Sequence, residues 1–224
     1  MYNTNMVTLI FLRHGLSTTN NKGHFTGQID APLHERGEKQ AQDVARYFLS
    51  GAYAVDKIYS SSSSRAYSTV LPTAEALGLP VERMDELKEV DVGNWGGRSF
   101  EEIEKTEPTA FRLFRENVGL ARYGDGESTA EAQARMLKTV QKLAEENEGK
   151  TLLIATHGTV LRALYCAWSG VPLAELKGVT IAPNASLSVA RYEDGKGEFL
   201  SYGYDEYLSE KTPYVPFNKR KDLA

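Results

Sequence analysis

Short apolar runs alternate with longer segments of helical period along most of this chain. The runs are VTLIFL at 7–12, DKIYSS at 56–61, TLLIAT at 151–156 and SLSVARY at 186–192. Between the first two, ERGEKQAQDVARYFLSG repeats its apolar residues at helical spacing and ends at Gly51. Strands that alternate with helices pair in parallel, because each crossover helix returns the chain to the same end of the sheet. The pattern predicts an α/β fold whose central sheet is mostly parallel and flanked by helices.

Two further segments also have helical period. AYSTVLPTAEALG, at 66–78, contains Pro72, and a proline inside a helix removes a backbone donor, so a kink or a break is expected there. VLRALYCAW, at 160–168, predicts a helix after the run at 151–156. With 224 residues, no internal repeat and no interdomain linker, the chain is expected to form one domain over 1–224.

Two capping pairs mark helix starts in the middle of the chain. In such a pair a Ser side chain accepts from the N–H three residues on, where a Glu reaches back. The pairs are Ser99 with Glu102 and Ser128 with Glu131. The second pair opens a helix predicted over 129–147. The first lies in a segment at about 98–127, which we expect to be a helical insertion over the C-terminal edge of the strands.

The charge and the cysteine content of the chain indicate which cellular compartment and which binding partners to expect. A formal net charge of −4 disfavours a surface built for nucleic acid or anionic membrane, so any basic site must be concentrated in one place. The single cysteine, Cys166, excludes an intrachain disulfide and lies in an apolar run, which suits core packing in a reducing compartment. No segment has the pattern of a secretory leader or a membrane span. We therefore expect a cytoplasmic protein without a nucleic-acid or membrane partner.

Two of the predicted strands end in the same dipeptide, His-Gly. His14 comes after the run at 7–12 and Arg13, and His157 comes directly after the run at 151–156. In an open parallel sheet the C-terminal ends of the strands lie on one edge, where ligands bind, and neighbouring strands are about 4.8 Å apart. A single histidine is more often a core or surface residue. Two at equivalent positions predict a shared crevice.

Two arginines are expected at the same edge as these histidines. Arg13 precedes His14, and the strand at 56–61 leads through serines to Arg65. Guanidinium groups match phosphate and carboxylate oxygens with paired hydrogen bonds. Each cation within about 4 Å of an anionic charge contributes on the order of 4 kcal/mol of Coulomb energy at an effective dielectric near 20, before desolvation. The residues indicate an anionic substrate, either a phosphate or a carboxylate.

Six short segments carry a further signal through their order along the chain. They are LRHGLSTTN, GQIDAPLHERGEKQA, SSSSSRAYST, LKEVDVGNWGG, GES at 126–128 and ATHGTVLRAL. Each is weakly specific alone, but in this order they resemble the histidine phosphatase superfamily, in its phosphoglycerate mutase-like branch. The resemblance covers most of the chain up to about residue 189. It implies an α/β fold with a helical insertion, and a phosphatase of small phosphate monoesters that forms a covalent phosphohistidine.

Matched position by position, the resemblance implies a role for each residue at the edge. His14 would be the nucleophile, and Glu89 of LKEVDVG would be the general acid and base. Three residues, Arg13, Arg65 and His157, would hold the transferring phosphate during catalysis, and Asn20 and Gly158 would add contacts to it. The substrate would be a small phosphorylated metabolite, and no cofactor is implied.

Three positions depart from the family pattern. Leu16 stands where Glu or Gln is usual, His34 where PLT has its threonine, and Gly96 where an acid or amide is usual. None of these departures removes a catalytic group. A histidine at a helix start predicts a weaker cap than a hydroxyl would give. Leu16 and Gly96 leave the orientation of the substrate open, and Gly96 beside Gly97 predicts a looser loop.

Other chemistries find less support in the residues. His24 and His34 could join the strand-end histidines around a metal, but no clear metal-ligand spacing is present and two arginines would repel a cation, so no metal is expected. A phosphoglycerate mutase stays an alternative, although the family's mutases usually have a longer insertion between the acid and the second histidine and an E-R-x-Y-G signature. A catalytically inactive module that binds a phosphorylated partner is the second alternative.

The residues do not identify the substrate or the oligomeric state. Four residues of the insertion could form a roof over the site, but their helical spacing equally fits packing onto the sheet, which we favour. They are Phe111, Phe114, Arg115 and Tyr123.

The tail at about 205–224 is rich in Tyr and Pro and predicts a partly ordered terminus, with a lid or a dimer contact as alternatives. A homodimer stays open.

Overall fold

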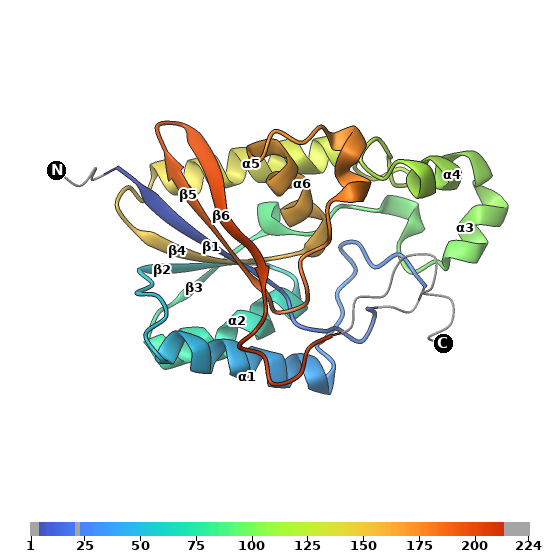
Figure 1. The fold of residues 1–224 in the computed structure, drawn as a ribbon. Helices are drawn as coiled ribbons and strands as arrows, with labels where there is room; N and C mark the ends of the chain where they lie inside the picture. The colour runs from blue at the N-terminus through green and yellow to red at the C-terminus, as the bar shows by residue number, and fades with distance from the viewer. Residues whose placement is uncertain (1–4, 21–22, 213–224) are drawn as a thin grey trace.

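The computed structural model describes residues 5–20 and 23–212, whose strands form one six-stranded sheet (Figure 1). The strands are β1 (Val7–Arg13), β2 (Lys57–Ser61), β3 (Val81–Met84), β4 (Thr151–Thr156), β5 (Leu187–Glu193) and β6 (Lys196–Tyr204). Their order across the sheet is β3-β2-β4-β1-β5-β6. The pairs among the first four are parallel, whereas β5 is antiparallel to both β1 and β6. The predicted α/β fold with a mostly parallel sheet is confirmed.

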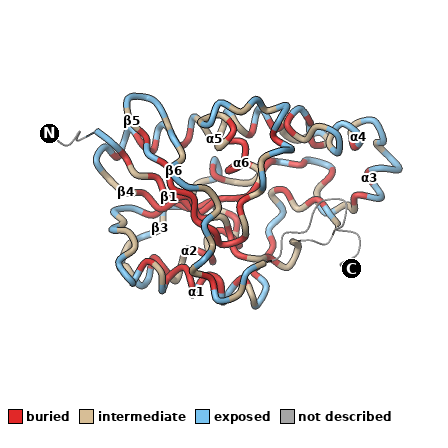
Figure 2. Tube along the Cα trace, viewed as in Figure 1, coloured by how far each residue is buried: buried red, intermediate tan, exposed pale blue. Residues whose placement is uncertain are grey.

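Four helices cover the two faces of this sheet. They are α1 (Glu35–Leu49) and α2 (Ser64–Leu77) on one face, and α5 (Thr129–Glu145) and α6 (Gly158–Trp168) on the other (Figure 1). Alternate residues of β1 point to opposite faces, so Leu9 and Phe11 join the α5 and α6 core while Ile10 and Leu12 join the α1 and α2 core. Figure 2 shows the buried residues concentrated between these layers. No helix in the described ranges is long and apolar enough to cross a membrane.

The apolar runs did not predict the two edge strands, β3 and β6. Residues of β3 are half-buried or exposed, and no residue of β6 is fully buried. An edge strand is held largely by backbone hydrogen bonds to one neighbour, here β2 for β3 and β5 for β6. Such strands need little apolar surface, and this explains why an apolar pattern does not find them.

The helix starts follow the predicted caps. Both capping boxes form, with Ser99 opening α3 (Phe100–Thr106) and Ser128 opening α5. His34 caps α1 with its imidazole, since Nδ1 accepts from the backbone N–H of Arg36 at 3.2 Å. The ring therefore supplies the acceptor that a hydroxyl would have given.

Pro72 does not break its helix, contrary to one of the two outcomes that we expected. The helix α2 continues from Ser64 to Leu77 with the proline inside it. A proline costs a helix about 3 kcal/mol through the lost hydrogen bond and a steric clash. Packing offsets this cost, because Ala66, Val70 and Ala74 are buried in the core between α1, α2 and the sheet.

The insertion contributes α3 and α4 (Pro108–Glu116), which lie beyond the C-terminal ends of the parallel strands (Figure 1). Aromatic residues of the insertion, together with Trp95 just before it, gather around Phe25, a residue of the loop that follows β1. The ring centroids of Trp95, Phe100 and Phe114 lie 4.9, 4.8 and 4.9 Å from that of Phe25. Aromatic pairs at this spacing stabilise one another beyond simple burial. The cluster therefore fixes the insertion over the edge of the sheet.

The first part of the tail lies against α1. In residues 205–212, the ring of Tyr207 stacks on Tyr47 of α1 with centroids 4.5 Å apart. Glu210 forms an ion pair with Arg36 of the same helix at 3.2 Å. The tail is thus ordered further than a loose terminus would be, and our prediction for the residues after 212 lies outside the described ranges.

Candidate active site

The strand-end histidines meet at the C-terminal edge of the parallel strands. Arg13 of β1 is in register with Thr156 of β4, so His14 and His157 follow at the same level. The His14 N–H donates to the Thr156 carbonyl at 3.0 Å, and the two imidazole centroids are 5.1 Å apart. Parallel pairing of β1 and β4 thus brings together two histidines that are far apart in the sequence.

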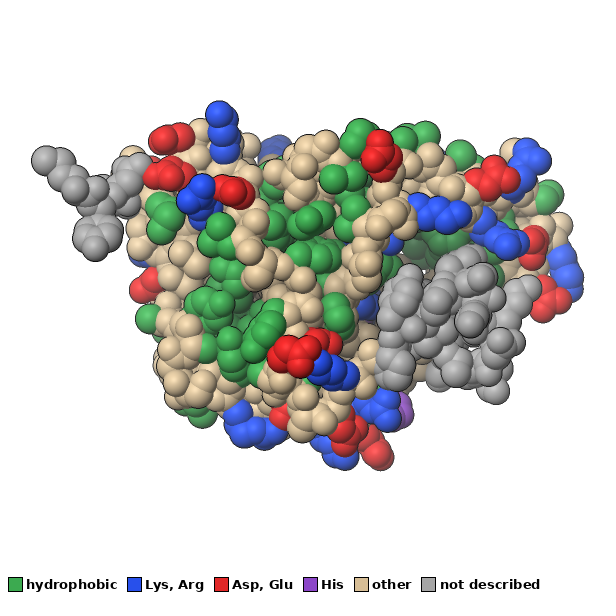
Figure 3. All heavy atoms as spheres, viewed as in Figure 1, with side chains coloured by type: hydrophobic (Ala, Val, Ile, Leu, Met, Phe, Trp, Pro, Cys, Tyr) green, Lys and Arg blue, Asp and Glu red, His purple; other side chains and the backbone are tan. Residues whose placement is uncertain are grey.

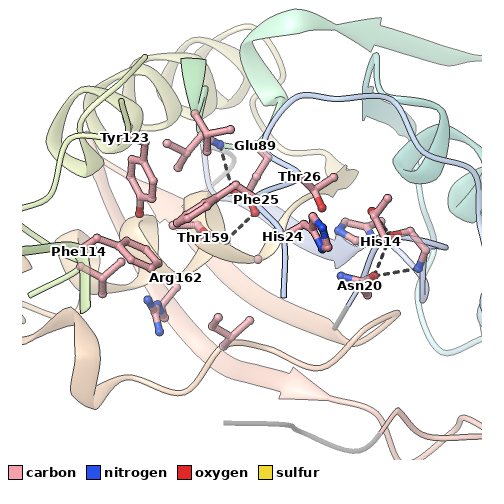
Figure 4. A pocket seen from close by; sticks show the side chains of 18 of the residues that line it. His14, Asn20, His24, Phe25, Thr26, Glu89, Phe114, Tyr123, Thr159 and Arg162 are labelled. Carbon is pink, nitrogen blue, oxygen red and sulfur yellow. Dashed lines mark hydrogen bonds between the residues drawn. The ribbon is translucent and has the colours of Figure 1, made fainter. Parts of the chain in front are cut away.

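A cavity of about 560 Å³ lies at this edge, between the sheet and the insertion (Figure 4). Six of the seven predicted site residues line it: Arg13, His14, Asn20, Arg65, Glu89 and Gly158. The seventh, His157, is fully buried beside His14 and is not among the described lining residues. Three departures from the family pattern, Leu16, His34 and Gly96, are also absent from the described lining.

The backbone holds His14 in one neutral tautomer. Its Nδ1 lies 2.8 Å from the carbonyl oxygen of Gly15. Because a carbonyl only accepts, Nδ1 carries the proton and Nε2 keeps its lone pair. Burial, together with the positive charges of Arg65 and Arg13, lowers the pKa of His14 well below its ordinary value of 6.5. A neutral imidazole with an available lone pair is the form of histidine that can act as a nucleophile.

Two residues without a predicted role fix the loop that carries this hydrogen bond. The Gly15 N–H donates to Oγ1 of Thr69 at 2.8 Å. The Asn184 side chain donates to the carbonyl of His14 at 3.0 Å and to that of Gly15 at 3.3 Å. Thr69 is the last residue of the quoted segment SSSSSRAYST, so a local signal existed for it. Asn184 lies in a distant loop, and no pattern in the sequence pointed to it.

The guanidinium groups of Arg13 and Arg65 are positioned by neutral backbone acceptors. Arg65 is 2% exposed and donates to the carbonyls of Ile29 and Gly27 at 2.9 and 2.8 Å. Arg13 donates to the Ala182 carbonyl at 2.6 Å. A carbonyl carries no net charge, so these hydrogen bonds orient each guanidinium without neutralising it, and both residues line the cavity.

Steric contacts explain why glycine occupies the second position of the second His-Gly dipeptide. Gly158 is the first residue of α6, and a Cβ placed there would lie 3.2 Å from Cζ of Arg13 and 3.0 Å from a methyl carbon of Ile181. Few real Cβ atoms show contacts this short. Glycine therefore lets the Arg13 guanidinium lie against the start of α6.

Glu89 is anchored at the N-terminus of α6. Its Oε2 accepts from the Thr159 N–H at 3.0 Å, and its Oε1 accepts from the N–H groups of Val160 and Val90 at 3.2 and 3.0 Å. The first turn of a helix presents N–H groups without intrahelical partners and favours negative charge. The carboxylate is thus held in one place on the cavity wall (Figure 4).

Arg135 of α5 holds the loop that carries Glu89, and sequence reasoning missed it. Its guanidinium donates to the carbonyls of Glu86, Lys88 and Glu89 at 2.7, 3.0 and 3.3 Å. It also forms a two-pronged ion pair with Glu127 at 2.8 and 2.7 Å. Glu127 is the acid of the quoted segment GES, and the structure shows that its partner is this arginine.

The buried His157 is also a neutral ring, and one of its two nitrogens has no partner among the described residues. Its Nε2 lies 2.8 Å from Oγ of Ser61, and its Nδ1 is buried without a hydrogen-bond partner in the described part of the chain. Burial, with the charges of Arg65, His14 and Arg13, lowers the pKa of His157 well below 6.5. If the Ser61 hydroxyl donates to Nε2, Nδ1 carries a proton that a ligand oxygen can accept.

The two depressed pKa values predict that the protein loses stability in mild acid. An unfolded chain protonates both imidazoles near pH 6.5, whereas folded His14 and His157 stay neutral until lower pH. The unfolded state then binds more protons, so the free energy of unfolding falls as pH drops below about 6.5, by up to about 1.4 kcal/mol per pH unit for each ring. Urea unfolding at pH 7.5, 6.5 and 5.5 in phosphate-free buffer measures this slope.

Matched variants test whether these rings cause the slope. His14→Asn and His157→Asn, each of which removes one of these rings, should each reduce the pH dependence below 6.5. A His14→Asn protein with the full slope of the parent would contradict this account.

The insertion residues divide between packing and cavity lining. Phe111 is 2% exposed, packs in the aromatic cluster and does not line the cavity, as we favoured. The preference for packing alone was wrong for Phe114, Arg115 and Tyr123, which line the cavity. Phe114 and Tyr123 do both, since their rings also contact Phe25. Helical spacing could not separate these roles, because one turn of α4 faces both the cluster and the cavity.

Potential metal ligands do not gather in the described ranges. No group of three or more His, Cys, Asp or Glu side chains is arranged there to hold a metal ion. His34, a proposed member of such a group, is instead the cap of α1.

Comparisons with known proteins identify the family of this chain. The model of the histidine phosphatase superfamily, branch 1, matches residues 9–205. The chain belongs to this superfamily. Among its relatives is phosphoserine phosphatase 1 of Hydrogenobacter thermophilus, 35% identical over 205 residues, which are 92% of this chain and 96% of that protein. The metal-independent phosphoserine phosphatase of Arabidopsis thaliana is 32% identical over 203 residues, which are 90% and 83% of the two chains.

Solved structures of histidine phosphatases support the same conclusion. YhfR of Bacillus stearothermophilus superimposes with a TM-score of 0.84 at 29% identity, covering 91% of this chain and 100% of its own. The expected phosphoglycerate mutase-like fold is confirmed. Superfamily membership, with phosphatases matching nearly the whole chain, shows that this histidine phosphatase is a phosphoric monoester hydrolase.

Proposed function

We propose that the chain hydrolyses small phosphate monoesters through a phosphohistidine formed on His14, with Glu89 as general acid and then general base. The observation that carries this proposal is the tautomer of His14. Its Nδ1 proton is committed to the Gly15 carbonyl, which leaves the Nε2 lone pair available at the cavity.

The charge of the cavity wall suits a phosphate ester. The described lining includes five cations and a single acid, Glu89. The cations are Arg13, Arg65, Arg115, Arg162 and Lys177. The net charge of the chain is −4, so this positive charge is local. A neutral nucleophile among fixed cations avoids the repulsion that an anionic nucleophile would meet at a phosphate.

In the first half-reaction, the Nε2 lone pair of His14 forms a bond to phosphorus. The bond from phosphorus to the ester oxygen breaks, and that oxygen takes a proton from Glu89 as the alcohol leaves. Arg13 and Arg65 stabilise the charge on the transferring group, with Asn20 and Gly158 beside it. His157 donates from Nδ1, which has no partner among the described residues.

In the second half-reaction, a water oxygen attacks the phosphorus of the phosphohistidine. The Glu89 carboxylate accepts the proton of that water, the bond from phosphorus to Nε2 breaks, and its electron pair returns to His14. The products are inorganic phosphate and the starting enzyme. One carboxyl group serves both steps, which agrees with its fixed position at the start of α6.

The proposal also covers metal independence, the type of substrate, the location and the oligomeric state. The name of the Arabidopsis relative supports a reaction that needs no metal, and the names of both relatives support a small phosphorylated metabolite as substrate. A cytoplasmic location stays a prediction from the single cysteine, and a homodimer stays open.

The reaction type is tested with 3-phosphoglycerate, which a phosphatase hydrolyses and a mutase isomerises. We expect inorganic phosphate to form faster than 2-phosphoglycerate, with or without a bisphosphate primer, and with EDTA present throughout. Phosphate release is followed colorimetrically and the isomer by a coupled enolase assay. Predominant isomerisation would make the chain a mutase. Loss of activity in EDTA, with recovery on adding zinc or magnesium, would contradict the metal-free mechanism.

A further inference from the structure

Arg162 is a buried cation with no anionic partner in the described part of the chain. It lies in α6 and is 8% exposed. Its Nη1 donates to the Val179 carbonyl at 3.2 Å, and its Nε is buried without a hydrogen-bond partner. A guanidinium has five N–H donors, and buried donors in folded proteins normally have acceptors. An acceptor supplied by a ligand would complete this environment.

This guanidinium lines the active-site cavity, away from the proposed nucleophile. Figure 4 shows Arg162 at the end where Phe114 and Tyr123 lie, with His14 and Asn20 at the other end and Glu89 between them. The charge of Arg162 also acts on the Tyr123 hydroxyl, whose pKa burial raises to about 12. A substrate whose phosphate lies at His14 would therefore extend its alcohol part towards Arg162.

The other cations at this end are exposed and already engaged. Arg115 forms an ion pair with Glu104 at 3.0 Å, and Lys177 donates to the Arg115 carbonyl at 3.1 Å. Figure 3 shows cations and acids interspersed on the surface around α3 and α4. Arg162 is thus the single buried positive charge among the described cations at this end, whereas Arg13 and Arg65 together face the phosphate.

We propose that Arg162 binds a carboxylate on the leaving group, so that the preferred substrates are small phosphate monoesters whose alcohol part carries a carboxylate. One buried guanidinium matches the charge and planar shape of a carboxylate, while a second phosphate would need more buried charge than this end supplies. The inference rests on the proposed phosphatase function and adds a residue that determines specificity.

Two pairs of esters that differ in the carboxylate test this assignment. 3-Phosphoglycerate is compared with glycerol 1-phosphate, and phosphoserine with phosphoethanolamine. The parent protein should prefer the carboxylated member of each pair by about 10²-fold in kcat/KM, since a site built for a polar group rejects analogues that lack it. Arg162→Met should reduce that ratio by about 10²-fold, and Arg162→Lys should keep part of it, because lysine retains the charge but not the paired donors.

The control is Arg191→Met, which removes an exposed cation of β5 that pairs with Glu198 outside the cavity. It should leave both ratios unchanged. Equal rates for the two members of each pair in the parent, or an Arg162→Met protein that slows all four esters equally, would overturn the assignment of Arg162 while leaving the phosphatase function standing. No phosphate release from any of the four esters would instead count against the proposed function itself.

Discussion

Replacing His14 with alanine is expected to abolish phosphate transfer, lowering kcat/KM by at least about 10⁴-fold, because the variant lacks the atom that bonds to phosphorus. Brief incubation of the parent protein with ³²P-labelled substrate, followed by quenching without acid, should trap one labelled phosphate per chain. The adduct should be labile in acid and stable in base, as expected for a phosphohistidine. Peptide mapping then places the label on His14.

A second histidine variant separates the chemistry from general damage. His34→Ala removes the imidazole cap of α1, outside the described cavity lining, and should cost only about 1 kcal/mol of stability. It should form the labelled adduct at the parent level. An adduct of unchanged amount and chemistry in His14→Ala would mean that another group is the nucleophile.

Replacing Glu89 with glutamine is expected to slow phosphorylation of the enzyme by about 10²- to 10⁴-fold for substrates with poor leaving groups. An alkoxide such as that of serine needs a proton to depart, whereas p-nitrophenolate departs readily without one. The variant should therefore lose much less rate with p-nitrophenyl phosphate. Both arginines stay in place, so substrate affinity should persist.

The measurement for Glu89→Gln is a single-turnover rate with enzyme in excess, since hydrolysis of the phosphohistidine can hide the contrast at steady state. Arg65→Ala provides the comparison. It removes charge stabilisation from the phosphoryl group itself and should slow both esters by similar factors, around 10²- to 10³-fold. Equal losses with aryl and alkyl phosphates in Glu89→Gln would exclude Glu89 as the general acid and direct attention to Asp91, which lies two residues on.

Several parts of the fold could be predicted because they depend on contacts close in the sequence or on the general geometry of a parallel sheet. The buried strands β1, β2, β4 and β5 appear as apolar runs since their residues pack on both faces. The two capping boxes join residues three positions apart. The meeting of His14 and His157 also followed, because parallel strands place their C-terminal ends on one edge.

Tertiary structure decided the features that depend on distant partners. Asn184 reaches the carbonyl of His14 only because β5 pairs beside β1, and Arg135 reaches the Glu89 loop only because α5 packs against that segment. The path of α2 through Pro72 depends on burial of its apolar face. In the sequence, Arg162 is only one polar residue in an apolar helix, and its burial depends on the elements that pack around that helix.

The sequence by itself therefore determined the α/β class, the capped helices and the edge of the sheet where the reacting groups gather. The first two follow from periodicity and from hydrogen bonding within a few residues, and the third follows from the geometry of parallel strands. The tertiary structure decided how Asn184 holds the loop after His14, how Glu89 is supported and how far Arg162 is buried. Each of these depends on the position of a backbone carbonyl or a neighbouring helix, and packing of the whole domain sets those positions.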